Sequence, residues 1–131
     1  MAPVLLDTTV VIDLLRGCRG AAQRLEALRA AGDAPQVCAI TIEETVRGLR
    51  PREHEPVERL FRGLRIAPLG RREGWLAGQW RRAHASRGQT LAQADCLVGA
   101  AALSAGGRLA TGNPRDSPMK QLSVEHWPAG E

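Results

Sequence analysis

Short apolar runs alternate with longer amphipathic stretches along this chain of 131 residues. The short runs hold few polar residues, which is typical of strands buried on both faces of a parallel sheet. The longer stretches repeat apolar residues at helical spacing, and several end near a glycine. The predicted strands cover residues 3–7, 36–40, 65–69, 108–111 and 122–127, and the predicted helices cover 9–16, 21–32, 41–48, 55–64, 72–87 and 95–106. This alternation predicts an α/β fold, with helices on both faces of a mostly parallel sheet of four to five strands.

The composition fits a single domain over residues 1–131. Apolar residues make up 44% of the chain, which is enough for one packed core. Cys18, Cys38 and Cys96 are widely spaced, so we expect reduced residues rather than a disulfide frame or a zinc site. No apolar run is long enough to span a membrane, and the first residues lack the features of a signal peptide. We therefore expect a cytoplasmic protein with no membrane partner.

The net charge of +4 comes almost entirely from arginine, because Lys120 is the only lysine. Guanidinium groups form bidentate contacts with phosphates, so this charge is compatible with a nucleic-acid partner. An excess of arginine and alanine is equally typical of a GC-rich genome. Charge alone therefore does not decide the class of partner.

Four acidic residues from distant parts of the chain follow predicted strands or begin predicted helices. They are Asp7, Glu44, Asp95 and Asp116. Sites in open α/β sheets form outside the carboxyl ends of the strands, so we expect these side chains to meet at one edge. Each also has a purely structural explanation. Asp7 and Asp95 suit helix N-caps, Glu44 completes a capping box with Thr41, and Asp116 suits a turn.

Several carboxylates within a few ångströms of one another are unfavourable unless a cation lies among them. Oxygen ligands without clustered histidine or cysteine favour Mg²⁺ or Mn²⁺. Such an ion lowers the pKa of bound water and neutralises a phosphodiester in its transition state. Thr9 and Asn113 are candidates to position that water or to orient the carboxylates. The four acids therefore favour metal-dependent phosphate chemistry.

Each of the four acids lies in a recognisable sequence block. In chain order the blocks are LLDTTVVIDLLRG with Asp7, ITIEETVRGL with Glu44, DCLVGAAAL with Asp95 and LATGNPRD with Asp116. Together they resemble the PIN-domain nucleases, and in particular the VapC-type toxin ribonucleases of type II toxin–antitoxin systems. The resemblance covers nearly the whole chain, although the fourth block departs from the family pattern at Gly112. It implies a PIN-like three-layer α/β/α sandwich.

The resemblance also implies a divalent-metal-dependent endoribonuclease that is the toxin of a toxin–antitoxin pair. Asp7, Glu44, Asp95 and Asp116 would hold one or two Mg²⁺ or Mn²⁺ ions, and Thr9 would support the water or the metal. The implied substrate is structured RNA of the tRNA or rRNA class. The implied partners are a second copy in a homodimer and a VapB-type antitoxin, with DNA contacted only through that antitoxin.

Further expectations concern the surfaces that meet these partners. RNA binding should use arginines that closely follow the blocks, namely Arg16, Arg47, Arg87 and Arg115. Apolar residues of the first two helices should leave a groove for an antitoxin segment, although packing of these helices on each other explains the same pattern. They are Val10, Val11, Leu14, Leu15, Leu25 and Leu28. Glu43 lies about 100° around its helix from Glu44 and should face solvent.

Three other functions fit parts of the pattern. A haloacid-dehalogenase-like phosphatase needs a second acid two residues after the first, where this chain has Thr9. A receiver domain needs an acidic pair near the first strand and an aspartate on a middle strand, and neither is present. The remaining alternative is a non-catalytic, basic nucleic-acid-binding or scaffolding α/β module. Metal-dependent RNA cleavage would distinguish the nuclease from that module.

Overall fold

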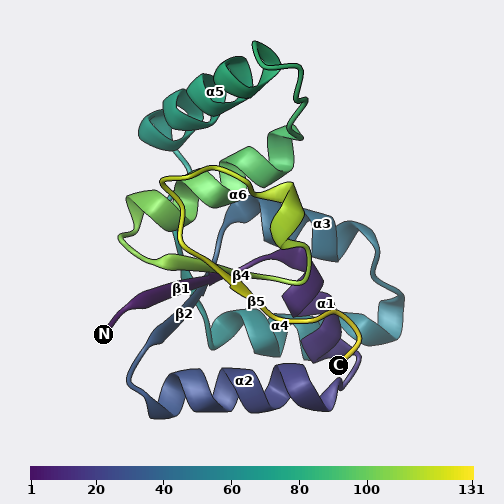
Figure 1. The fold of residues 1–131 in the computed structure, drawn as a ribbon. Helices are drawn as coiled ribbons and strands as arrows, with labels where there is room; N and C mark the ends of the chain where they lie inside the picture. Colours follow the sequence, from purple (N-terminus) through teal and green to yellow (C-terminus); the bar gives the residue numbers. More distant parts are fainter.

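The computed structural model describes residues 1–131, and its five strands pair in parallel in one sheet (Figure 1). The strands are β1 (Pro3–Leu6), β2 (Ala34–Val37), β3 (Arg65–Ile66), β4 (Arg108–Thr111) and β5 (Val124–His126). Their spatial order is β3-β2-β1-β4-β5, so the chain starts at the centre, extends to one edge and then builds the other side. The predicted parallel sheet is confirmed, and its central strand β1 ends beside its neighbour β4.

Helices cover both faces of the sheet. On one face lie α5 (Arg71–Ala85) and α6 (Gln93–Ser104), and on the other lie α1 (Thr8–Leu15), α2 (Arg19–Ala30) and α4 (His54–Arg62) (Figure 1). The remaining helix, α3 (Ala39–Arg47), follows β2 and contacts both α1 and α6. The predicted three-layer α/β/α sandwich is therefore confirmed. Because α1 and α3 directly follow the neighbouring strands β1 and β2, their first turns lie at one edge of the sheet.

The side chains of β1 alternate between two hydrophobic clusters, one on each face of the sheet. Val4 and Leu6 pack with residues of α1 and α2, including Val10 and Leu25. Leu5 lies in the cluster that contains the buried side chains of α5 and α6. All three β1 residues are at most 1% exposed. Burial on both sides explains why the sequence of this strand shows no polar alternation.

The second strand and the helix after it begin earlier than the sequence predicted. β2 ends at Val37, and Cys38 is the N-cap residue of α3. Thr41 therefore lies inside the helix, fully buried, and its Oγ1 has no hydrogen-bond partner. The predicted capping box between Thr41 and Glu44 is wrong. An apolar run such as Val37–Ile40 does not show by itself where a buried strand gives way to a buried helix.

The apolar residues of α1 and α2 face the core rather than a groove. Val10, Val11, Leu25 and Leu28 are at most 7% exposed, and Leu14 and Leu15 pack against the same cluster. Leu15 also lines a hollow beside Glu44 and Leu49, but the other five residues pack in the core. The predicted antitoxin groove along both helices is therefore wrong, and the alternative of mutual packing holds. A short helix beneath a twisted sheet buries a broad apolar stripe, which the sequence alone underestimated.

The three cysteines are all free, as expected. Cys38 and Cys96 are buried in the core, while Cys18 is partly exposed at the start of α2. No helix combines the length and the apolar character needed to cross a lipid bilayer.

Candidate functional site

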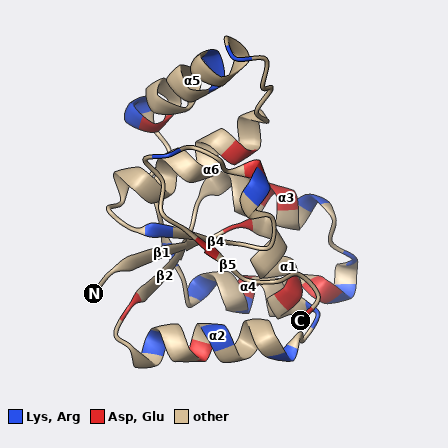
Figure 2. Cartoon of the chain, in the orientation of Figure 1, with Lys and Arg blue, Asp and Glu red and all other residues tan.

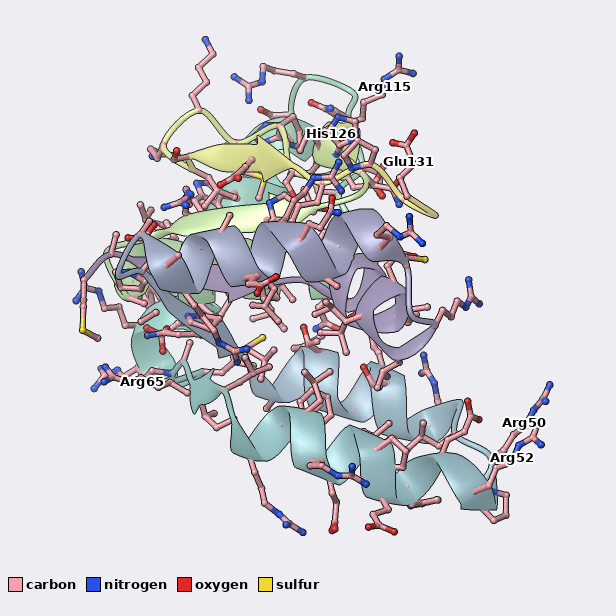
Figure 3. All side chains as sticks on the ribbon, turned by 90° about the horizontal axis from the view of Figure 1, so that it is seen from below. Arg50, Arg52, Arg65, Arg115, His126 and Glu131 are labelled. Atoms are coloured by element: carbon pink, nitrogen blue, oxygen red, sulfur yellow. The ribbon has the colours of Figure 1, made fainter.

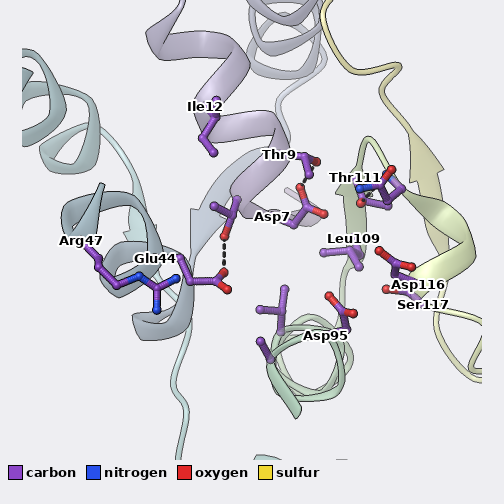
Figure 4. A pocket seen from close by; sticks show the side chains of 14 residues that line it. Asp7, Thr9, Ile12, Glu44, Arg47, Asp95, Leu109, Thr111, Asp116 and Ser117 are labelled. Atoms are coloured by element: carbon purple, nitrogen blue, oxygen red, sulfur yellow. Dashed lines mark hydrogen bonds between the residues drawn. The ribbon is translucent and has the colours of Figure 1, made fainter. Parts of the chain in front are cut away.

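A pocket of about 300 Å³ opens at the carboxyl ends of β1 and β4 (Figure 4). It contains all four predicted acids, each contributed by a different part of the chain. Asp7 follows β1, Glu44 lies on α3, Asp95 lies in the first turn of α6, and Asp116 ends the short 3₁₀ helix Pro114–Asp116. The other lining residues are Thr8, Thr9, Ile12, Arg47, Ala94, Val98, Leu109, Thr111, Asn113 and Ser117.

Asp7 has a structural role as well as a place in the pocket. Its side chain is the N-cap of α1, because Oδ1 accepts a hydrogen bond of 3.2 Å from the backbone N–H of Val10. The same oxygen accepts a bond of 2.5 Å from the hydroxyl of Thr9. The rigid junction between β1 and α1 thus fixes the orientation of this carboxylate.

Thr8 and Thr9 link separate parts of the pocket. The Oγ1 of Thr9 accepts a bond of 2.8 Å from the backbone N–H of Gly112, so it joins Asp7 to the segment after β4. A β-carbon on Gly112 would lie 3.1 Å from that oxygen. Thr8 donates a bond of 2.6 Å to Oε1 of Glu44 across the pocket (Figure 4).

The pKa of Asp95 depends on the other three acids. Burial raises the pKa of Asp95, and the charges of Asp116, Asp7 and Glu44 raise it further, to about 6. At neutral pH without a bound cation, the pocket therefore holds several negative charges in an unfavourable arrangement. An acid with its pKa near 6 still ionises at physiological pH.

Burial also raises the pKa of Asp7, although its hydrogen bonds oppose this effect. Hydroxyl groups of Thr111 and Thr9 and the backbone N–H groups of Val10 and Thr9 all favour the ionised form. These donors hold the carboxylate in place without a counter-charge. Burial thus raises the pKa of both Asp7 and Asp95 above its ordinary value.

The rim of the pocket is more polar and more open than its floor. Asp116 is exposed, whereas Val98 and Leu109 are buried. Arg47 lines the rim and lies 3.7 Å from Glu43, which faces solvent as predicted. Arg115 of the 3₁₀ helix extends outward, as Figure 3 shows.

Sequence reasoning missed the contributions of Thr8 and Thr111. The register pairs Leu6 of β1 with Ala110 of β4, so the next residues, Asp7 and Thr111, lie beside each other. Only the strand order reveals this, because the two positions are 104 apart in the sequence. Asp13, the other acid of the first block, is buried and accepts a bond of 2.9 Å from the backbone N–H of Gly130.

The donors in the pocket suit a hard divalent cation. Carboxylate, hydroxyl and amide oxygens line it, and no histidine or cysteine does. No three acidic, histidine or cysteine side chains lie close enough together to hold one ion directly. Mg²⁺ commonly uses only one or two carboxylates and keeps several waters, so the arrangement fits an ion bound partly through water. The charges that raise the pKa of Asp95 are those that such an ion would offset.

Comparisons with known proteins agree with this architecture. One chain in the crystal structure of DNA-bound VapBC from Salmonella typhimurium superposes with a TM-score of 0.85 at 22% identity, over 97% of this chain and 99% of that chain. A chain of VapBC2 from Rickettsia felis bound to a promoter DNA fragment gives 0.85 at 18% identity, over 95% and 98%. A chain of FitAcB from Neisseria gonorrhoeae gives 0.77 at 26% identity, over 92% and 95%. No curated protein sequence matches this chain.

The sequence itself matches the model of the PIN domain over residues 4–122. The matched region begins in β1 and extends to the residues before β5, so it contains all four acids of the pocket. The chain belongs to the PIN domain family.

Proposed function

We propose that this protein is a divalent-metal-dependent endoribonuclease and the toxin of a VapBC-type toxin–antitoxin pair. The observation that carries the proposal is the meeting of four carboxylates in one pocket, where three of them raise the pKa of the fourth. A fold has no structural need for such crowding, because it costs stability in the absence of a cation. Membership of the PIN domain family and the fold shared with chains of VapBC complexes support the same function.

Asp7, Glu44, Asp95 and Asp116 would hold the metal. When bound, Mg²⁺ or Mn²⁺ would supply an activated water and offset the charge that develops on a phosphodiester. The protein's own contribution is orientation: Thr9 and the N-cap bond fix Asp7, and Thr8 fixes Glu44. Asn113 is exposed and lines the side of the pocket where a phosphate would enter. Arg47 on the rim offers a guanidinium to the same phosphate.

Cleavage assays on purified protein test the activity. We expect cuts within structured RNA of the tRNA or rRNA class in Mg²⁺ or Mn²⁺, and no cuts in excess EDTA. Sequencing of RNA 5′ ends after brief induction would identify the substrate and the cut site. Undiminished cleavage in EDTA would contradict the metal-dependent mechanism, and absence of cleavage under all conditions would favour a non-catalytic nucleic-acid-binding module.

A chain of hollows offers a route for an antitoxin segment. A hollow of about 440 Å³ between α3 and α4 is lined by Val46, Leu49 and Phe61. The next, of about 190 Å³, shares Leu49 with it, and shares Ile12 and Glu44 with the acid pocket. An amphipathic segment laid along this route would bury its apolar side chains and bring a basic one to the acids. This groove replaces the one that the sequence predicted on α1 and α2.

The antitoxin groove makes a mutational prediction. Val46 is 44% exposed, so Val46→Asp should leave the fold intact. It would place a carboxylate under the antitoxin segment and weaken binding by about tenfold or more. The measurement is the affinity for the product of the adjacent small reading frame, with Ile66→Asp as a matched control, since Ile66 is 54% exposed at the far edge of the sheet. Equal affinity of both variants would exclude this groove.

Co-expression tests the biological role. We expect the protein alone to stop growth and the adjacent gene product to restore it. A protein that is harmless alone would refute the toxin role while leaving the nuclease proposal in place. We further propose a cytoplasmic homodimer that contacts DNA only through the antitoxin, and sedimentation of the free toxin and of the complex tests the assembly.

A further inference from the structure

The net positive charge of the molecule arises from one segment. Residues 71–90 contain five of the 18 basic residues and only one of the 14 acidic residues. The rest of the chain holds thirteen of each, so the net charge of +4 belongs to this segment. The one acid, Glu73, is 5% exposed, and its carboxylate accepts a bond of 2.6 Å from the backbone N–H of Gly70. The exposed charged side chains of α5 are therefore all positive. Figure 2 shows blue positions on this helix together with the red of its buried acid.

The same surface exposes a tryptophan. Trp75 is 71% exposed, whereas Trp80 and Trp127 are at most 5% exposed. A large aromatic ring in water is unfavourable, and α5 has already buried Ala77, Trp80 and His84 against the core. Packing of the helix therefore does not explain Trp75.

Two hollows adjoin the exposed side chain of Trp75. One hollow is lined by Arg71, Arg72 and Trp75, and a second by Gly74, Trp75, Gly78, Gln79 and Arg82. A β-carbon on Gly74 or Gly78 would meet no atom within 4 Å, so the glycines keep this space open. Residues three and four positions apart share a helix face, which sets the arginines beside the ring.

We propose that this face of α5, formed by Arg71, Arg72, Trp75, Gln79 and Arg82, binds RNA that presents an unpaired base. Trp75 stacks on the base, and the arginines contact the phosphates on either side of it. The inference rests on the proposed RNA substrate and names the element that holds it. It concerns binding away from the acid pocket, so it is testable without cleavage.

The chemistry of the face favours RNA over two other partners. The buried core of a protein interface is more apolar than the rest of the surface, and a membrane-binding helix presents a broad apolar face. Around Trp75 there are only arginines, glycines and a glutamine. A flat ring among guanidinium groups matches the alternating bases and phosphates of a nucleic-acid strand.

The position of α5 connects this face to the acid pocket. The exposed segment that follows α5 contains Arg87 and no acid, and it leads into α6, which carries Asp95 in its first turn. The Nε of Arg81 donates a bond of 3.2 Å to the carbonyl of Leu91, which ties this connection to α5. A strand bound on α5 thus has a basic path toward the pocket.

The test measures RNA binding in EDTA, where no cleavage interferes. The probe is a labelled stem-loop RNA with unpaired loop nucleotides, and a fully paired duplex of similar length serves as comparison. We expect Trp75→Ala to bind the stem-loop about tenfold more weakly and the duplex almost unchanged. Trp75→Phe should retain most of the affinity, because phenylalanine also stacks.

The arginines are tested by the salt dependence of the same binding. The triple variant Arg71→Gln, Arg72→Gln, Arg82→Gln should reduce the slope of log affinity against log salt by about 2. The matched control is Arg59→Gln, Arg62→Gln on α4, where both arginines are paired with glutamates and exposed. We expect that control to bind the stem-loop almost as the wild type does.

Three results would overturn the inference. The first is wild-type RNA affinity in both Trp75→Ala and the triple variant. The second is an equal loss of RNA affinity in the α4 control. The third is altered sedimentation of Trp75→Ala with unchanged RNA affinity, which would make the face an interface between copies. The outcome is separable from the nuclease proposal. If RNA binds through Trp75 but is never cut, the result supports this inference and refutes the nuclease proposal. If Trp75→Ala binds and cuts RNA as well as the wild type does, the result refutes this inference and supports the nuclease proposal.

Discussion

Replacement of either Asp7 or Asp95 should abolish RNA cleavage while the protein remains folded. We expect Asp7→Asn and Asp95→Asn each to lower the cleavage rate by about 100-fold or more, because each removes a charged oxygen from the metal site. Asparagine is as good an N-cap as aspartate, so Asp7→Asn keeps the start of α1. The rate is measured on a labelled RNA at saturating Mg²⁺, with circular dichroism to show that both variants are folded.

Glu43→Gln is the matched control for this experiment. Glu43 lies next to Glu44 in the sequence, but its side chain is 61% exposed and pairs with Arg47 at the surface. We expect this variant to cleave RNA at nearly the wild-type rate. If Glu43→Gln were as inactive as the two aspartate variants, general loss of negative charge would explain the result and the pocket would not be the site.

The stability of the metal-free protein should fall as pH rises from about 4 to about 6. The pKa of Asp95 is raised from its ordinary value of 3.8 to about 6 in the folded protein. Between these two values the unfolded chain loses a proton that the folded chain keeps, so each unit of pH favours unfolding. Above the folded pKa the cost is constant. Because Asp95 is only partly buried, we expect about 1–2 kcal/mol after allowance for solvent screening.

Two treatments should remove this cost. Asp95→Asn eliminates the charge, so at pH 7 without metal the variant should be more stable than the wild type by the same 1–2 kcal/mol, or roughly 4–7 °C in melting temperature. Mg²⁺ should stabilise the wild type in proportion to the occupancy of its site and stabilise Asp95→Asn much less. Urea unfolding from pH 4 to pH 8, with and without Mg²⁺, measures the difference in stability between the two proteins and the effect of Mg²⁺ on each. An equal effect of Mg²⁺ on the two proteins would mean that the ion binds elsewhere.

The sequence predicted the layers of the fold well because the inner strands are buried on both faces of the sheet. Strands without polar alternation, such as β1 and β4, occur mainly in parallel sheets covered by helices. The pattern was weakest where one apolar run spans the end of β2 and the start of α3, and there Thr41 was wrongly assigned as a cap. Hydrophobic periodicity locates elements and leaves their ends uncertain by a few residues.

The acids of the pocket were predictable because the topology rule is simple: residues after parallel strands meet at one edge. Their detailed environment was not. Thr8 bonds Glu44 across 36 positions of sequence, and Thr9 bonds Gly112 across 103. Such contacts depend on the order and register of the strands, which no local pattern encodes. The exposed Trp75 looked like an ordinary helix residue in the sequence, since burial is decided by the neighbours that the fold supplies.

The segregation of charge between α5 and the rest of the chain makes the molecule an electric dipole. At physiological ionic strength its field extends about 8 Å from the surface, so it acts only during the last stage of an encounter. A polyanion that arrives near α5 is attracted, and one that arrives near the acid pocket is repelled. Added salt should therefore slow the association of RNA much more than it changes the lifetime of the complex. Stopped-flow mixing at several ionic strengths would separate these two rates.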